Sequence, residues 1–160
     1  MTYTTYMNSP IGCLILKATD THICRVGWVP EEGNDKIEVP TPLLQMAIDQ
    51  LNEYFAGERI HFELPLQQEG TPFQQRVWEE LLKIPYGERI SYQELATRVG
   101  NPKACRAVGS ANGQNHIFII VPCHRVIQSG GKTGGYAYGT AMKDTLLDLE
   151  NKLNNPSLFE

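Results

Sequence analysis

The sequence lacks the features that would place the protein in a membrane or outside the cell. Its 160 residues contain no apolar run long enough to span a bilayer. The first residues show no basic segment followed by an apolar stretch, so we expect no secretory signal. The four cysteines form no CxxC pair and are too few for a disulfide framework. We therefore expect reduced thiols and a cytoplasmic protein.

The chain also lacks internal repeats and a well-spaced set of metal ligands. Cys13 and Cys24, with His22 or His61, are the best candidates for a zinc site, but their spacing is poor. We therefore expect no metal. The overall composition is that of a globular chain, with 41% hydrophobic and 20% charged residues. A chain of this length can bury a sizeable core in one domain or in two small ones.

Basic residues are scarce in the first half of the chain and acidic residues are scarce in the second. Residues 1–70 carry four basic and ten acidic side chains, a net charge of −6. Residues 71–140 carry eight basic and four acidic side chains, a net charge of +4. The second half can therefore approach phosphate groups, whereas the first half cannot. The alternative is a scatter of solvated surface charge.

A polar stretch at residues 64–72, with two prolines and a glycine, has the composition of a linker. It predicts an α/β protein with an N-terminal sheet-plus-helix domain over residues 1–68 and a C-terminal domain over residues 69–160. In the first domain, Thr41 can cap a helix that ends at Gly57. Three segments of this domain are typical of short strands, at residues 3–7, 11–18 and 22–29.

The C-terminal domain is predicted to be mostly helical, with a helix-turn-helix. Thr71 can cap a helix that has Pro72 at its first position. Ser91, followed three residues later by Glu94, has the capping-box signature of a second helix, and a third begins near Lys103. Two short helices joined by three or four residues match a helix-turn-helix, although a plain helical hairpin is an alternative. Ala, Gly and Ser line the third helix, which favours DNA binding with little sequence preference.

A cysteine interrupts an apolar run at residues 119–127. Five positions of the run are aliphatic, which favours a buried strand or core segment. Pro122 is expected to end the strand and to present Cys123 at a turn. The charges of His124 and Arg125 favour the thiolate, which is the nucleophilic form of cysteine. The alternative is a free cysteine buried as a small hydrophobic residue.

Six segments of the second half carry specific motifs: Phe73-Gln74-Gln75-Arg76-Val77-Trp78, Ile84-Pro85-Tyr86-Gly87-Glu88, Ser91-Tyr92, Gly100-Asn101-Pro102-Lys103-Ala104, Arg106-Ala107-Val108-Gly109 and Ile120-Val121-Pro122-Cys123-His124-Arg125-Val126-Ile127. In order and spacing they resemble the C-terminal domain of the O6-alkylguanine-DNA alkyltransferases, also called methylated-DNA–protein-cysteine methyltransferases. The resemblance extends from Thr71 to about Glu150. The first half is similar to the family's variable N-terminal domain chiefly through Tyr54-Phe55-Ala56-Gly57-Glu58.

The resemblance implies direct DNA repair by a protein that is consumed in the reaction. Cys123 attacks the alkyl carbon of O6-alkylguanine, and of O4-alkylthymine, and keeps the group irreversibly as a thioether without a cofactor. His124 acts as the base through a water and Glu150 orients it, as in a nucleophile–base–acid triad. From the residues alone, Asp148 or Asp144 would serve as well as Glu150. The implied partner is double-stranded DNA, with no membrane, and the protein is expected to be a monomer.

The resemblance also assigns residues to DNA binding and to a pocket for a flipped nucleotide. Arg106 fills the vacated stack, Tyr92 protonates the leaving guanine, and Asn115 supports the active site as a hinge. Without the resemblance, Tyr92 would be a core aromatic and Arg106 an ordinary phosphate contact. The other assignments are Tyr92, Lys103, Ala104, Ser110 and Arg125 for DNA, and Val126, Tyr136, Ala137 and Tyr138 for the substrate pocket.

Two positions depart from the family's pattern. Tyr138 stands where the family has glycine or another small residue, so we expect bulky O6-benzyl groups to react less well than O6-methyl. Cys105 replaces an alanine of similar size beside Arg106, and we expect it to be unreactive.

Three other classes of protein fit parts of the sequence. A cysteine hydrolase would use Cys, His and an acid, but it has no use for a helix-turn-helix and needs an oxyanion hole. An alkyltransferase-like damage-binding protein lacks the acceptor cysteine, whereas Cys123 is present. A transcription factor would show a strong sequence preference, which the helix of small residues does not favour.

Overall fold

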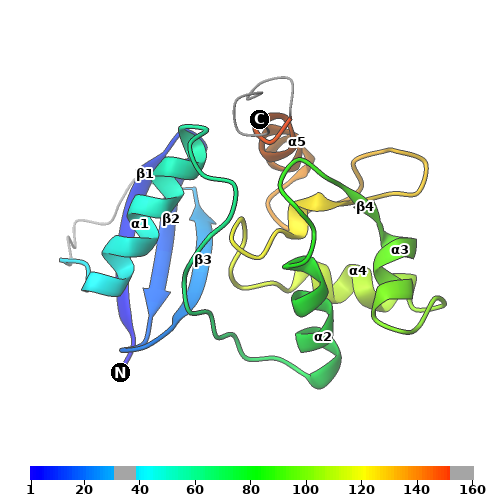
Figure 1. Cartoon of the computed structure of the whole chain (residues 1–160), viewed down its shortest axis with the longest axis horizontal. Helices are drawn as coiled ribbons and strands as arrows, with labels where there is room; N and C mark the ends of the chain where they lie inside the picture. The colour runs from blue at the N-terminus through cyan, green and yellow to red at the C-terminus, as the bar shows by residue number, and fades with distance from the viewer. Residues whose placement is uncertain (31–38, 152–160) are drawn as a thin grey trace. The chain divides into compact units, whose positions relative to one another are not determined.

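The computed structural model of the chain describes residues 1–30 and 39–151 (Figure 1). The chain divides into two compact units between Gln68 and Glu69, within the polar stretch 64–72. The first unit contains a sheet and one helix, and the second is mostly helical. The predicted α/β class, with its order of a small sheet followed by helices, is therefore confirmed.

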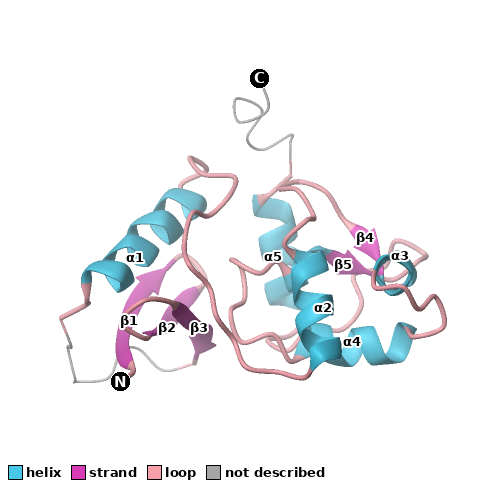
Figure 2. Ribbon diagram, turned by 60° about the horizontal axis from the view of Figure 1, so that its bottom comes forward, coloured by secondary structure: helices cyan, strands magenta, loops and turns pink. Residues whose placement is uncertain are grey.

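The N-terminal unit is a three-stranded antiparallel sheet of order β1-β2-β3 with helix α1 packed on it (Figures 1 and 2). Leu14 and Leu16 of the central strand, together with Leu44 and Leu51 of the helix, are fully buried. Thr41 accepts a hydrogen bond from the Leu44 amide and so caps α1. The elements are β1 (Tyr3–Ser9), β2 (Gly12–Ala18), β3 (Ile23–Val29) and α1 (Pro42–Phe55), within two residues of the predicted strands and helix.

The C-terminal unit is built around four helices, α2 (Pro72–Leu81), α3 (Tyr92–Arg98), α4 (Cys105–Gly113) and α5 (Thr140–Leu149) (Figure 2). Helix α4 packs against both α2 and α3. The indole of Trp78 joins α2 to α4, because its Nε1 donates to the Ala111 carbonyl at 2.9 Å. Helices α3 and α4 form the predicted helix-turn-helix, but their connection, residues 99–104, is longer than expected.

The capping box lies at a different helix from the one predicted. Thr71 accepts from the Gln74 amide, and the Gln74 side chain accepts from the Thr71 amide, so the complete box begins α2. Ser91 caps α3 by accepting from the Glu94 amide. The Glu94 carboxylate instead pairs with Arg98 one turn further along the helix.

The prediction of a strand before Pro122 is wrong, although the burial of that run is correct. Residues 118–120 form turns, and a short 3-10 helix η1 (Cys123–Arg125) begins after Pro122. Strand β5 (Val126–Ile127) begins only after η1 and pairs in parallel with β4 (Ile90–Ser91). The backbone before Pro122 is bonded locally instead, since the Val121 amide donates to the Ile117 carbonyl.

None of the helices within residues 1–30 and 39–151 is long and apolar enough to cross a membrane. In the same residues, no three His, Cys, Asp or Glu side chains are grouped so that they could hold a metal ion.

Replacing Thr71 with alanine removes the capping box of α2. We expect the free energy of unfolding of the C-terminal unit to fall by about 1 kcal/mol, because the Gln74 amide loses its partner. Urea denaturation followed by Trp78 fluorescence, in a Trp28→Phe background, measures this. Thr71→Ser keeps the hydroxyl and should lose much less. Equal midpoints for Thr71→Ala and the parent would contradict the assigned cap.

Candidate active site

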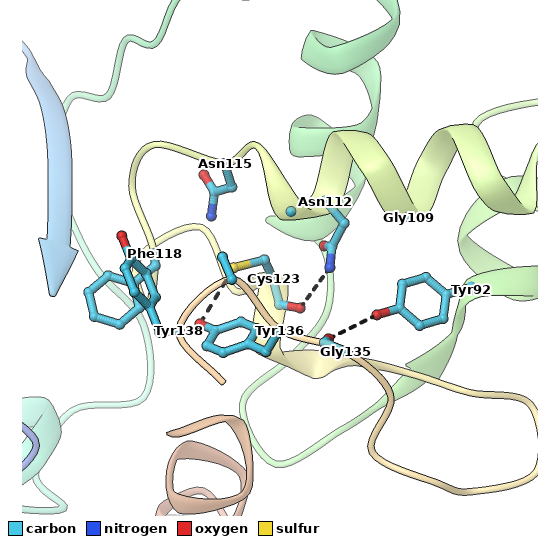
Figure 3. A pocket seen from close by; sticks show the side chains of 11 residues that line it. Tyr92, Gly109, Asn112, Asn115, Phe118, Cys123, Gly135, Tyr136 and Tyr138 are labelled. Carbon is cyan, nitrogen blue, oxygen red and sulfur yellow. Dashed lines mark hydrogen bonds between the residues drawn. The ribbon is translucent and has the colours of Figure 1, made fainter. Parts of the chain in front are cut away.

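A cavity of about 240 Å³ opens in the C-terminal unit beside Cys123 (Figure 3). Its wall comes from helices α3 and α4, from the turns before Pro122 and from the loop before α5. The lining residues are Tyr92, Gly109, Asn112, Gly113, Asn115, Phe118, Cys123, Gly135, Tyr136, Ala137 and Tyr138. The cysteine singled out by the sequence therefore lines a cavity beside the helix-turn-helix.

Cys123 is the first residue of η1, and it is held from two sides. Its carbonyl oxygen accepts from Nδ2 of Asn112 at 3.2 Å, and its thiol donates to the Tyr136 hydroxyl at 3.6 Å (Figure 3). Burial raises the pKa of the thiol, while hydrogen bonds from Asn115 and Tyr136 and the charge of Lys143 oppose that rise. The site thus keeps a mainly protonated thiol unless a base takes the proton.

A buried carboxylate organises the residues that follow the cysteine. Glu150 accepts from His124 through Oε2 at 2.6 Å, and from Arg125 through Oε1 at 2.7 Å and Oε2 at 3.0 Å. A third guanidinium nitrogen of Arg125, Nη1, donates to the Ile84 carbonyl at 2.6 Å. All three side chains are buried. Of the three acids considered from the sequence, Glu150 is the one that lies on His124, whereas Asp144 and Asp148 are exposed.

The protonation states in this network follow from burial and charge. Burial alone would raise the pKa of Glu150, but His124 and Arg125 together hold that pKa well below its usual range. Burial lowers the pKa of His124 despite the opposing effect of Glu150, so the imidazole is neutral at pH 7. Nε2 of His124 points to Glu150, and Nδ1 is buried with no hydrogen-bond partner among the described residues. Nδ1 is therefore the atom that can accept a proton.

Two predictions about charge near Cys123 need correction. Arg125 was expected to contact DNA, but its guanidinium is buried on Glu150 and stacked 5.8 Å from the Tyr86 ring centroid. It therefore does not reach a phosphate. Arg125 and His124 were also expected to favour the thiolate, but both are bound to the carboxylate of Glu150, which neutralises their effect.

Asn115 fixes the turns that precede the cysteine. Its Nδ2 donates to the Val121 carbonyl at 2.8 Å and to the Ile117 carbonyl at 3.3 Å, and its Oδ1 accepts from the Ile117 amide at 3.1 Å. The side chain of Asn115 thereby satisfies backbone groups of this segment that a neighbouring strand would otherwise bind.

The residues assigned to DNA, apart from Arg125, lie on α3, on α4 and in the connection between these two helices. Arg106, Lys103 and Ser110 are exposed, and Ala104 is half-buried. Tyr92 is half-buried at the cavity, with its hydroxyl 3.4 Å from the Gly135 carbonyl (Figure 3).

Three of the four predicted pocket residues line the cavity: Tyr136, Ala137 and Tyr138. Val126 does not line it, because it is fully buried in β5. The ring of Tyr138 packs on Phe118 with centroids 4.8 Å apart (Figure 3). An aromatic wall of Phe118, Tyr136 and Tyr138 therefore stands beside the thiol.

Sequence reasoning missed Phe118, Asn112 and Lys143. Phe118 belongs to an apolar run whose composition is typical of a buried core segment, so nothing in the sequence marked it as a pocket residue. Asn112 and Lys143 carried a usable signal, since each is a polar residue on the buried face of its helix, Asn112 beside Val108 and Lys143 beside Leu147.

Comparison with known protein families identifies both units. Residues 72–152 match the model of the 6-O-methylguanine DNA methyltransferase DNA binding domain. Residues 1–68 match the model of the 6-O-methylguanine DNA methyltransferase ribonuclease-like domain. The chain belongs to the 6-O-methylguanine DNA methyltransferase family.

Individual relatives and solved structures are similar to this chain over nearly its whole length. The constitutive methylated-DNA–protein-cysteine methyltransferase of Bacillus subtilis is 48% identical over 158 residues, covering 94% of this chain and 96% of the relative. The methylated-DNA–protein-cysteine methyltransferase of Mycobacterium leprae is 46% identical, with 96% of each covered. The crystal structure of Mycobacterium tuberculosis O6-methylguanine methyltransferase superimposes with a TM-score of 0.86 at 43% identity, covering 100% of both chains. Mycobacterium tuberculosis OGT in complex with DNA gives a TM-score of 0.84 at 45% identity, covering 98% of this chain and 99% of that one.

Replacing Glu150 with glutamine should destabilise the C-terminal unit at pH 7 by roughly 3 kcal/mol, because Arg125 keeps a buried charge without its counter-ion. The folded-state pKa of Glu150 is depressed, so its contribution is present above the ordinary value of 4.5 and is lost as the pH falls. The pKa of His124 is also depressed, so below its ordinary value of 6.5 the unfolded chain binds a proton that the folded unit does not. Both effects make the parent protein less stable in acid.

Urea denaturation between about pH 7 and about pH 3, followed by Trp78 fluorescence in the Trp28→Phe background, measures this pH dependence. The difference between parent and Glu150→Gln should shrink only below about pH 4.5, where the carboxyl group of the unfolded chain takes up a proton. Asp148→Asn, which removes an exposed carboxylate of the same helix, is the matched control and should change little. A Glu150→Gln variant as stable as Asp148→Asn at pH 7 would refute the role of the buried carboxylate.

Proposed function

We propose that the protein repairs alkylated DNA directly, by moving a methyl or other alkyl group from O6-alkylguanine, and from O4-alkylthymine, to its own Cys123. It acts as a methylated-DNA–protein-cysteine S-methyltransferase that reacts once. The observation that carries the proposal is a buried thiol in a cavity bordered by the helix-turn-helix. Relatives named for this activity cover almost the entire chain.

The proposed reaction begins with loss of the Cys123 proton. Neutral His124 accepts that proton at Nδ1 through a water molecule, and Glu150 holds the imidazole in the orientation that keeps Nδ1 free. The thiolate then attacks the alkyl carbon, a carbon–sulfur bond forms, and the carbon–oxygen bond breaks with its electron pair leaving on guanine. The thioether is a poor leaving group, so the cysteine is consumed and no cofactor takes part.

The target base reaches Cys123 only after it is flipped out of the duplex, because an O6-alkyl group is inaccessible inside the stack. Arg106, exposed on α4, fills the vacated place, and Tyr92 donates a proton to the leaving guanine. Asn115 supports the turn that carries the cysteine. Lys103, Ala104 and Ser110 bind the backbone of double-stranded DNA on the same side as Arg106, with little sequence preference because α4 presents small side chains.

We further propose that residues 69–160 form the DNA-binding and alkyl-acceptor domain and that the protein works as a cytoplasmic monomer. All residues that line the cavity come from the C-terminal unit, so the proposed reaction needs no residue from a second copy. All four cysteines are free, and a free thiol acceptor needs the reducing conditions of the cytoplasm.

Mixing the protein with a duplex that carries O6-methylguanine should add one methyl group per molecule, located on Cys123 by intact mass and peptide mapping. Cys123→Ser should abolish the transfer, because a hydroxyl is a far weaker nucleophile than a thiolate. Cys105→Ser, which changes a half-exposed cysteine on α4, is the control and should react normally. Several product molecules per protein would instead indicate a hydrolase, and labelling of Cys123→Ser would refute the acceptor.

The ring of Tyr138 should limit the size of the transferred group. Because it packs on Phe118 at the cavity, O6-benzylguanine should react more slowly than O6-methylguanine in the parent protein. Tyr138→Gly should raise the benzyl rate, by roughly tenfold for a contact worth 1–2 kcal/mol, and leave the methyl rate nearly unchanged. Tyr138→Phe keeps the ring and should behave as the parent. Single-turnover rates measure both; comparable parent rates for the two groups would contradict the restriction.

A further inference from the structure

Asn112 is a buried polar residue of the cavity wall, and one of its polar atoms has no task in the proposed reaction. It lies on α4, is 4% exposed and points toward Cys123 (Figure 3). Its Nδ2 donates to the Cys123 carbonyl at 3.2 Å. Its Oδ1 is buried and has no hydrogen-bond partner among residues 1–30 and 39–151. Burying an acceptor without a partner is costly, so this oxygen calls for a physical reason.

The orientation of the Asn112 amide follows from its neighbour. A carbonyl oxygen can only accept a hydrogen bond, so the atom that faces the Cys123 carbonyl must be the nitrogen. Exchanging Nδ2 with Oδ1 would place two acceptors 3.2 Å apart. The atom without a partner is therefore an oxygen, and it takes up donors only.

The other polar side chains of the cavity wall are engaged within the protein. The Tyr92 hydroxyl donates to a backbone carbonyl at 3.4 Å, and the Tyr136 hydroxyl accepts from the thiol of Cys123. Asn115 uses both ends of its amide on the backbone of the turns before the cysteine. Among the buried side-chain atoms of the described residues that lack a partner, Oδ1 of Asn112 is the one that belongs to the cavity lining.

The two bases of the proposed function differ in the donors that they bring to this oxygen. An alkyl group on O6 of guanine removes the proton from N1, so the N–H donors of that base are those of its 2-amino group. An alkyl group on O4 of thymine removes the proton from N3, and this base keeps no N–H donor. A buried acceptor favours the base that can donate to it, because the other base leaves the acceptor unpaired.

We propose that Asn112 is a specificity-determining residue, whose Oδ1 accepts a hydrogen bond from the 2-amino group of the flipped guanine. The protein then reacts faster with O6-alkylguanine than with O4-alkylthymine. This inference rests on the proposed function. Asn112 makes and breaks no covalent bond, so the transfer to Cys123 proceeds as described above.

The position of Asn112 suits this role. Its bond to the Cys123 carbonyl ties the acceptor to the residue that carries the thiol, and in the proposed complex the amide turns about that bond so that Oδ1 faces the base. The oxygen is shielded from water, so a donor that reaches it forms a bond that water does not already supply. Arg106 is exposed on the same helix. Helix α4 would thus present one side chain to the duplex and another to the extruded base.

A base that lacks only the amine tests the proposal. O6-methylhypoxanthine has the ring system and the methyl group of O6-methylguanine but no 2-amino group. Methyl transfer to Cys123 is measured in single turnovers at saturating concentrations of duplexes that differ only in the target base. The parent protein should react roughly tenfold or more faster with O6-methylguanine than with O6-methylhypoxanthine or O4-methylthymine.

Asn112→Leu keeps a side chain of similar size and removes both polar atoms. The ratio of the guanine rate to the hypoxanthine rate should fall by roughly tenfold, chiefly through a slower reaction of O6-methylguanine. A displacement of Cys123 slows both duplexes alike and cancels in this ratio, and iodoacetamide labelling of Cys123 measures that displacement separately. Asn52→Leu, the same change at an exposed position of α1, is the matched control and should leave the ratio unchanged. Should Asn112→Leu fail to fold, Asn112→Ala also removes the acceptor and provides the same comparison.

A rate ratio in Asn112→Leu or Asn112→Ala equal to that of the parent would overturn the inference. Equal slowing of both duplexes is such a result, and it would show that Asn112 only supports Cys123. A parent protein that does not distinguish the two purines would overturn the inference as well. If the parent transfers no methyl group from O6-methylguanine, the proposed function fails and the inference falls with it, whereas transfer with an unchanged ratio removes the inference alone.

Discussion

The C-terminal unit depends on one buried carboxylate. Glu150 is almost completely removed from water, and its two oxygens accept three hydrogen bonds from His124 and Arg125. These bonds compensate for the desolvation of the charges, which would otherwise oppose folding. Through Arg125 the carboxylate also holds the Ile84 carbonyl, in the turn after α2. The end of α5, the short helix η1 and that turn are thereby joined at one point.

The bond between Glu150 and His124 also determines which nitrogen of the imidazole can act as a base. Burial keeps the imidazole of His124 neutral, although Glu150 opposes this effect. Because Glu150 binds the imidazole through Nε2, the other ring nitrogen is left free as a base. The positive charge that a thiolate requires then has to come from elsewhere. The charge of Lys143 on α5 lowers the pKa of the Cys123 thiol and so acts in this direction. A free base nitrogen next to the cysteine in sequence fits a reaction that begins with loss of a proton from sulfur.

The sequence predicted the features that depend on local chemistry. Thr41, Thr71 and Ser91 cap the helices that follow them, because a side-chain oxygen three residues before an amide satisfies it within a single turn. The strands of the first unit were equally predictable, because turn residues at Ser9-Pro10 and Thr19-Asp20 separate them. What failed were inferences from neighbours in sequence to neighbours in space. Arg125 is two residues from Cys123, yet its charge is directed to Glu150 on another helix.

The missing strand before Pro122 shows why periodicity alone was insufficient. A run of aliphatic residues is buried equally well as a strand or as successive turns, and composition does not separate the two. Asn115 decides between them, because its three hydrogen bonds to Ile117 and Val121 satisfy the backbone without a partner strand. Ile119 adopts a φ of 71°, which is costly for a β-branched residue. That cost is tolerable only where the surrounding contacts fix the chain. The same contacts give Cys123 a defined position in the wall of the cavity.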